Sequence, residues 1–259
     1  MLANHKILFD KINVRGMELK NRFAMAPMGP LGLGDANGGF NQRGIDYYTE
    51  RAKGGTGLII TGVTFADNEV EEHGMPNCPC ATYDPIQFVR TAREMTERIH
   101  AYGSKIWLQM SGGFGRVTIP TNLGEYPPVA PSPIMHRWLD KVCRELTVDE
   151  IHHIVKQFGN GAFHAKRAGF DGVEIHAVHE GYLIDQFAIS FFNHRRVRRL
   201  PGEPSALCQG DRGRDQIPLR RGLCGGSAVQ PQELHQGLAC RRTARRKVRG
   251  EGPRHPRGH

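Results

Sequence analysis

Two histidines and a tyrosine stand close together after a short apolar segment of the chain. His176 and His179 are three residues apart, and Tyr182 follows three residues later. Two imidazoles at this spacing can donate two hydrogen bonds to one carbonyl or carboxylate oxygen, and a nearby tyrosine hydroxyl can deliver a proton. The group therefore predicts acid–base chemistry on a carbonyl compound. The alternatives are a zinc site, for which no third ligand stands out, and one surface histidine beside one core histidine.

Three other apolar segments also end in residues that suit a ligand site. The Gln109 amide carries a donor and an acceptor that match the imide edge of a heterocycle, although a core glutamine satisfied by the protein fits as well. Gly62 permits a close approach of backbone to a ligand, or marks a bulge. Pro27, between Ala26 and Met28, removes a backbone donor and fixes a turn, or simply ends a strand.

Strands and helices alternate along the first 195 residues, and these elements must position the side chains above. Short apolar runs predict four strands, at residues 21–28, 57–64, 105–110 and 172–176. Helical spacing and start and stop signals predict three helices, at residues 41–53, at residues 85–102 and from a capping box at Thr147 to about Ala168. This order predicts parallel strands joined by crossover helices.

Two architectures fit this alternation, a doubly wound sheet and a (β/α)8 barrel. No G-x-G-x-x-G fingerprint follows a strand, which argues against a dinucleotide-binding sheet. Four βα units in about 195 residues match half of a barrel enlarged by loops. We therefore predict an α/β fold of the (β/α)8 TIM-barrel type, truncated to about its first four βα units. Chemistry in such barrels lies at the carboxyl ends of the strands, where the residues above are found.

Charge is divided unevenly along the 259-residue chain. The formal net charge is +9, but residues 1–195 hold 20 basic and 21 acidic side chains, whereas residues 196–259 hold 15 and 5. No apolar run suits a transmembrane helix, and the first residues do not form a secretory signal. The six cysteines do not form the disulfide framework of a small secreted protein. The spacing of Cys78 and Cys80 is a weak signal for a metal site. These features predict a cytoplasmic protein without a membrane partner.

Four segments, in order and spacing, resemble the Old Yellow Enzyme family of flavin-dependent oxidoreductases. The segments are NRFAMAPM at residues 21–28, GGFNQR with IDYY at residues 38–48, Gln109 with GFGR at residues 113–116, and GVEIHAVHEGYLIDQF at residues 172–187, which leads to Asn-His-Arg. The second of them is most similar to the clostridial 2-enoate reductases. The resemblance covers about residues 5–195, and it implies FMN on the barrel top with NAD(P)H as the electron source.

The resemblance also implies a role for each site residue. A flavin would be contacted by five residues: Ala26, Pro27, Met28, Gly62 and Gln109. His176 and His179 would hold the carboxylate or carbonyl of the substrate, and Tyr182 would protonate the α-carbon. The implied activity is reduction of the C=C bond of a small α,β-unsaturated carboxylate or thioester.

The chain departs from the family pattern in several places. Many relatives carry a histidine within the third-strand motif, where Ser111 and two glycines stand here, and Glu180 lengthens the gap between His179 and Tyr182 by one residue. The division of labour among the two histidines and the tyrosine is therefore open. Larger relatives also carry an FAD domain and a cysteine-ligated 4Fe–4S cluster. We predict neither of these, and no metal site, for this chain.

Residues 196–259 do not resemble the family. Relatives continue after Asn-His-Arg with Tyr-Gly-Gly-Ser-Leu-Glu-Asn-Arg, and codons can be chosen from Val197 onward so that reading from each second base gives that sequence. We therefore interpret this Arg-rich segment as an out-of-frame, disordered tail, which sequencing around codon 195 would test. The alternative is a basic arm that binds nucleic acid, but the segment lacks the aromatic residues that stack on bases.

A chain with only the first half of a barrel is expected to be an impaired enzyme. The phosphate site of such barrels usually lies in the loops after strands seven and eight, so the polypeptide as written is expected to bind FMN weakly or not at all. The alternative enzyme class is a flavin-free barrel lyase that uses the histidine pair, and a visible spectrum distinguishes the two. The sequence indicates neither the exact substrate, nor the reaction direction, nor the oligomeric state.

Overall fold

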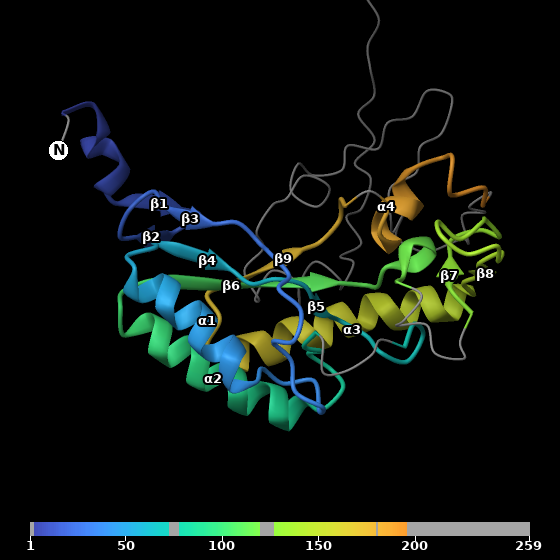
Figure 1. Ribbon diagram of the computed structural model, residues 1–259, viewed down its shortest axis with the longest axis horizontal. Helices are drawn as coiled ribbons and strands as arrows, with labels where there is room; N and C mark the ends of the chain where they lie inside the picture. Colours follow the sequence, from blue (N-terminus) through green and yellow to red (C-terminus); the bar gives the residue numbers. More distant parts are fainter. Residues whose placement is uncertain (1–2, 73–77, 120–126, 180, 196–259) are drawn as a thin grey trace, which may run out of the picture.

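A parallel sheet forms the centre of the computed structural model, which describes residues 3–72, 78–119, 127–179 and 181–195. Neighbouring strands of the sheet follow one another along the chain. In spatial order they are β3 (Ala24–Met25), β4 (Leu58–Ile60), β6 (Lys105–Ser111) and β9 (Gly172–Ile175) (Figure 1). A short strand, β5 (Thr64–Phe65), continues the line of β4 and pairs with the far end of β6.

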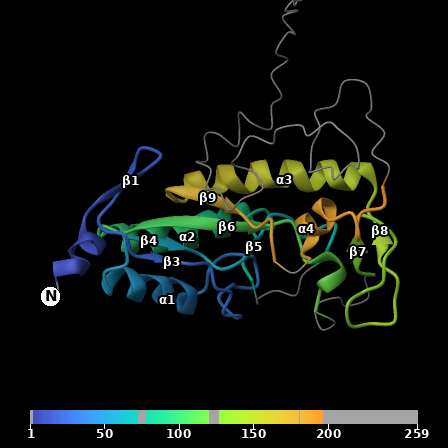
Figure 2. The same cartoon turned by 90° about the horizontal axis from the view of Figure 1, so that it is seen from above.

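Three helices cover one face of this sheet, as Figures 1 and 2 show from two directions. They are α1 (Gln42–Lys53), α2 (Pro85–His100) and α3 (Val148–Arg167). Each helix begins at a side chain that accepts a hydrogen bond from its first turn, namely Asn41, Asp84 and Thr147. Thr147 and Glu150 form the predicted capping box. The three predicted helices are therefore confirmed to within a few residues.

The side chains of β6 alternate between the two faces of the sheet. Ile106, Leu108 and Met110 are fully buried in the main core beneath the helices. Trp107 instead packs in a separate apolar cluster on the other face, with Leu58 of the neighbouring strand. Because successive side chains of a strand point to opposite faces, Gln109 shares the face of Trp107. One strand thus supplies both a dry helix-facing core and the polar residue of the predicted site.

Two of the four predicted strands are shorter than expected. The segment at residues 21–28 is regular only over β3, and Pro27, which has no backbone N–H, lies beyond its end. The segment at residues 57–64 divides into β4 and β5, because the Gly62 N–H donates to the Tyr48 hydroxyl (2.7 Å) and not to a neighbouring strand. The strands predicted at residues 105–110 and 172–176 agree with β6 and β9.

The structure also contains elements that the sequence pattern did not predict. At the amino ends of the strands lie the 3₁₀ helix η1 (Ala3–Phe9) and an antiparallel hairpin of β1 (Ile12–Val14) and β2 (Met17–Leu19). At the carboxyl ends lie the 3₁₀ helix η2 (Gly115–Val117), the paired strands β7 (Val129–Ala130) and β8 (Arg144–Glu145), and helix α4 (Leu183–Ala188). The added elements therefore occupy both ends of the sheet.

The described residues contain the four successive βα strands that the alternation predicted, in the order 1-2-3-4. No helix among the described residues is long and apolar enough to cross a membrane. The interpretation of residues 196–259 as an out-of-frame tail concerns a segment that lies outside the described residues.

Candidate active site at the carboxyl ends of the strands

The histidine–tyrosine group lies immediately after β9. The His176 backbone N–H donates to the Met110 carbonyl of β6 (2.8 Å), which fixes the start of the loop. The His176 ring centroid lies 5.1 Å from that of His179 and 5.0 Å from that of Tyr182. The rings of His179 and Tyr182 stack with their centroids 4.4 Å apart. The structure therefore brings the three side chains together, whereas Glu180 lies outside the described residues.

Burial keeps the His176 imidazole neutral. Burial and, to a smaller extent, the nearby His179 lower the pKa of His176 to about 4, against an opposing effect of the Asp185 carboxylate. A neutral imidazole has one N–H donor and one acceptor nitrogen. At neutral pH, His176 can therefore donate a hydrogen bond to a substrate oxygen without bringing a positive charge into the site.

The loop between His179 and Tyr182 is held by a buried carboxylate of α4. Asp185 Oδ2 accepts hydrogen bonds from the backbone N–H groups of His179 (2.7 Å) and Gly181 (2.8 Å). Gly181 has a φ of +96°, which an L side chain rarely adopts. Asp185 Oδ1 is buried and has no hydrogen-bond partner among the described residues. The sharp turn and its acceptor together direct His179 and Tyr182 toward the same space.

Gln109 lies on the adjacent strand and contacts a second acidic residue. Gln109 and Glu174 are paired in the register of β6 and β9, and Gln109 Nε2 donates to Glu174 Oε1 (2.8 Å). The Gln109 backbone N–H donates to the Thr61 hydroxyl (3.0 Å). Burial raises the pKa of Glu174, and the hydrogen bond from Gln109 opposes this. A primary amide has a second N–H and a carbonyl oxygen, so Gln109 retains the capacity to bind a ligand.

The segment after β3 packs closely against Gly62. A Cβ atom on Gly62 would overlap the Met28 carbonyl oxygen, so only glycine allows the two segments to meet. The Tyr48 hydroxyl that accepts the Gly62 N–H is buried, and burial raises the pKa of Tyr48 to about 12. Met28 is 55% exposed, Ala26 is exposed and Pro27 is half-buried. The strand end thus offers an apolar surface, and Gly62 is required by a contact within the chain.

A second buried carboxylate holds the loop that follows β6. Glu71 accepts hydrogen bonds from the backbone N–H groups of Phe114 (3.1 Å) and Gly115 (2.9 Å) and from the Thr118 hydroxyl. Burial raises the pKa of Glu71 to about 7, and these three donors oppose the shift. The Phe114 ring lies 4.7 Å from that of Tyr182. Glu71 therefore links the segment after β5 to the loop that supports the tyrosine.

Residues 7–199 match a known family model, which describes the NADH:flavin oxidoreductase / NADH oxidase family. The chain belongs to the NADH:flavin oxidoreductase / NADH oxidase family. It is 60% identical over 196 residues to cinnamate reductase of Clostridium sporogenes, and this match covers 75% of the chain and 29% of the relative. It is 32% identical to NADPH dehydrogenase of Listeria welshimeri, with 73% of the chain and 53% of the relative covered.

Solved structures of Old Yellow Enzymes share the fold. The Old Yellow Enzyme homologue of Zymomonas mobilis matches with a TM-score of 0.61 and 34% identity over 73% of the chain and 53% of that structure. Morphinone reductase matches with a TM-score of 0.63 and 27% identity, over 73% and 52% respectively. The fold and family predictions are confirmed, and the chain matches about half of the length of these TIM barrels. The chain spans about a third to a half of the length of these NADH:flavin oxidoreductase relatives.

Sequence reasoning missed three residues that shape this candidate site, namely Asp185, Glu71 and Tyr48. Asp185 has a recognisable signal, a lone acid within the apolar run YLIDQF. Glu71 has none, because it is one of four acidic residues in a short polar segment, and its neighbour Glu72 is exposed. The Tyr48 contact joins α1 to the end of β4, and the spacing of apolar residues carries no information about such a pairing.

The cysteine pair that gave a weak metal signal has a structural role in the described chain. Cys78 and Cys80 are both buried, and they pack in one cluster with Phe65, Phe114 and Val117. Burial raises the pKa of the Cys78 thiol to about 11. A thiol that resists ionisation is a poor nucleophile. We therefore assign these cysteines to the packing beneath the site.

Proposed function

We propose that this chain carries the amino-terminal half of an FMN-dependent ene-reductase. The proposed substrate is a small α,β-unsaturated carboxylate or thioester, and the reductant is NAD(P)H. The observation that carries the proposal is the grouping of His176, His179 and Tyr182, whose ring centroids lie within 5.1 Å of one another after β9. Membership of a flavin oxidoreductase family favours this reading over a flavin-free lyase. The similarity to a protein named cinnamate reductase supports an unsaturated acid.

The residues at the strand ends fit a flavin in their chemistry. Ala26, Pro27 and Met28 would lie against the ring system, since they present an exposed or half-buried apolar surface after β3. Gln109 would bond the polar edge of the ring through its amide, because Glu174 takes one donor and leaves other groups of that amide for a ligand. FMN, when bound and reduced by NAD(P)H, would supply the hydride for the β-carbon of the substrate.

The three side chains after β9 would bind and orient the substrate. Neutral His176 would donate its N–H to the substrate carbonyl or carboxylate oxygen, with His179 beside it as the second donor. These bonds strengthen as negative charge develops on that oxygen, which is the contribution of an oxyanion hole. The Tyr182 hydroxyl would deliver a proton to the α-carbon, a step typically worth about 10²–10⁴ in rate. Asp185 would keep the loop in the shape that this geometry requires.

Replacement of the tyrosine hydroxyl tests this assignment. In the protein expressed with its reading frame restored after residue 195, we expect Tyr182→Phe to slow the reduction of cinnamate by at least tenfold. Flavin reduction by NADH, measured separately by stopped-flow absorbance, should change little, because it needs no proton from Tyr182. A variant that slows both half-reactions equally would contradict the role of Tyr182 as the proton donor.

Flavin binding by the 259-residue polypeptide itself is expected to be weak. The described residues supply the first four strands of the barrel, whereas the phosphate site of such barrels usually lies after strands seven and eight. We therefore expect the purified polypeptide to show little of the visible absorbance that a bound oxidised flavin gives. Co-purification of one flavin per chain would refute this expectation.

We propose further that residues 196–259 carry no function of their own and are read out of frame. The family match ends at residue 199, close to the point at which the sequence departs from the family pattern. The segment has 15 basic and 5 acidic residues. Out-of-frame translation accounts for this excess of positive charge without a role in nucleic-acid binding. An uninterrupted reading frame in the transcript, or salt-dependent DNA binding that requires this segment, would contradict the proposal.

A further inference from the structure

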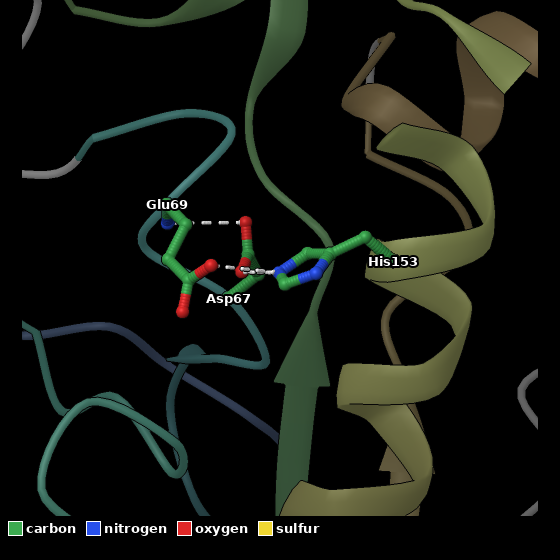
Figure 3. A group of neighbouring side chains, drawn as sticks. All are labelled: Asp67, Glu69 and His153. Carbon is green, nitrogen blue, oxygen red and sulfur yellow. Dashed lines mark hydrogen bonds and ion pairs between the residues drawn. The ribbon is translucent and has the colours of Figure 1, made fainter. Parts of the chain in front are cut away.

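Two acidic residues and a histidine from distant parts of the chain converge beside the sheet. Asp67 and Glu69 lie in the segment that follows β5, and His153 lies in the second turn of α3. Figure 3 shows both carboxylates directed at the same ring nitrogen of His153. One ligand atom from each residue lies within 4.8 Å of the other two. This cluster is separate from the histidine–tyrosine group and takes no part in the proposed reduction.

The contacts of His153 Nε2 exceed what a single ring nitrogen can satisfy. Asp67 Oδ1 lies 2.9 Å from it and Glu69 Oε2 lies 3.3 Å from it. The side-chain amide of Gln157, one helical turn further on, has its nitrogen 3.4 Å away. One N–H points at one acceptor only, so a proton on Nε2 cannot serve both carboxylates well. A cation placed between the three ligand atoms would serve all of them at once.

Backbone hydrogen bonds orient the buried carboxylate of Asp67 for such a cation. Asp67 is 4% exposed, and its Oδ2 accepts hydrogen bonds from the N–H groups of Val70 (2.9 Å) and Glu69 (3.2 Å). These bonds fix the side chain and leave Oδ1 directed at His153. The Glu69 side chain is 72% exposed, so an ion has access from solvent. Hydrogen bonds to the non-coordinating oxygen are what orient carboxylate ligands in metal sites.

We propose that Asp67, Glu69 and His153 form a binding site for a divalent transition-metal ion of the Zn²⁺ type. One imidazole and two carboxylates suit such an ion, whereas Ca²⁺ and Mg²⁺ prefer oxygen ligands alone. Gln157 stands where a fourth ligand would be needed, and its amide would offer oxygen after rotation, in exchange for the bond that it now accepts from Asn160. The ion would replace the proton shared between His153 and the carboxylates.

Occupation of this site would join the segment after β5 to α3. The same segment carries Glu71, which holds the loop after β6 through Phe114 and Gly115. A bound ion would therefore stabilise the loop on which the tyrosine of the proposed active site rests. It would act as a structural clamp, since it lies outside the group of residues that would contact substrate.

Equilibrium dialysis of the full 259-residue chain against Zn²⁺ tests the proposal. We expect one ion per chain to bind at this site, and His153→Ala and Glu69→Gln each to weaken that binding at least tenfold. His152→Ala is the matched control, because His152 is the exposed neighbour on the same helix. It should leave the affinity unchanged. Glu72→Gln controls in the same way for loss of an exposed carboxylate from the same segment.

Two results would overturn the proposal. One is Zn²⁺ binding that survives in both His153→Ala and Glu69→Gln, since it would come from other histidines of the chain. The other is equal binding of Ca²⁺, which would show a general acidic surface. Glu69→Gln changes an exposed side chain and is expected to fold, so a failure of His153→Ala to fold would leave the test intact. Zn²⁺ should also raise the Tm of the wild-type chain and of His152→Ala, but not of Glu69→Gln.

Discussion

The carboxylate of Asp185 fixes the backbone of His179, six residues earlier, through a hydrogen bond of 2.7 Å to its N–H. The same oxygen accepts from Gly181, so one side chain defines both sides of the turn. The Asp185 side chain is buried, and loss of its acceptor would leave two N–H groups without a partner. The geometry of the whole histidine–tyrosine group therefore depends on Asp185, which holds the backbone of the turn between His179 and Tyr182.

Removal of this acceptor should loosen the site and the fold together. We expect Asp185→Ala to lower the free energy of unfolding by about 1–3 kcal/mol, because buried donors are left unsatisfied. Urea unfolding followed by circular dichroism measures the change. Asp140→Ala, which removes an exposed carboxylate, should change it by less than about 0.5 kcal/mol. Equal effects of the two variants would show that Asp185 does not hold the turn.

The contact of Gly62 with the Met28 carbonyl should tolerate no side chain. We expect Gly62→Ala to destabilise the protein by about 1–3 kcal/mol or more, because the new methyl group overlaps backbone that must then shift. Gly54→Ala is the matched control: its φ of −68° suits alanine, and a Cβ there meets the Glu50 carbonyl at an ordinary 3.4 Å. Thermal unfolding should separate the two variants clearly, and similar Tm values would contradict the close approach.

Glu71 should be essential to the loop after β6. Glu71→Gln places an N–H group among three donors, and we expect a loss of about 1–3 kcal/mol in the free energy of unfolding. Glu72→Gln, at the exposed neighbouring position, should be nearly neutral. Denaturant titration of both variants measures the difference. A neutral Glu71→Gln would mean that water or another group takes over the three donors.

The half-buried His176 predicts a loss of stability in acid. Its pKa in the folded protein is about 4, below the roughly 6.5 of an unfolded histidine, so the unfolded chain binds the extra proton between these values. The free energy of unfolding should therefore fall as the pH falls from about 6.5 to about 4. The contribution of this partly solvated side chain is about 1–2 kcal/mol after allowance for solvent screening. His176→Gln should flatten the profile in that range, and parallel profiles for the two proteins would contradict this.

The order of strands and helices could be predicted from the sequence because it rests on local signals. Asn41, Asp84 and the Thr147 capping box mark the three helix starts, and the structure has a cap at each of them. The hairpin of β1 and β2 could not be predicted in this way, because each strand has three residues, too few for periodicity. A bulge at Gly62 was one of two readings of the sequence, but the cause of the break could not be predicted, since it depends on a hydroxyl from α1, fourteen residues away.

The same distinction applies to the candidate site, where residues close in sequence could be predicted and residues brought together by the fold could not. The histidine–tyrosine group could be predicted, because its members lie within seven residues of one another and follow one strand. The carboxylates that hold it could not, because the partners of Glu71 lie more than forty residues further along the chain. Asp67 and His153 are separated by 86 residues, and no sequence spacing points from one to the other. Residues that act by position become visible only when the fold brings distant segments together.

Because side chains alternate between the two faces of β6, insertion or deletion of one residue in this strand would move its core residues to the wrong face. Leu108 belongs to the dry core, and Gln109, the next residue, belongs to the predicted ligand site. A slip of one residue in this strand would turn the amide into the core and expose the leucine to the ligand side. A single-codon insertion between Lys105 and Leu108 should therefore abolish folding and ligand binding in one event. Such an insertion in a surface loop would cost far less, so evolution can lengthen the loops of this chain but not this strand.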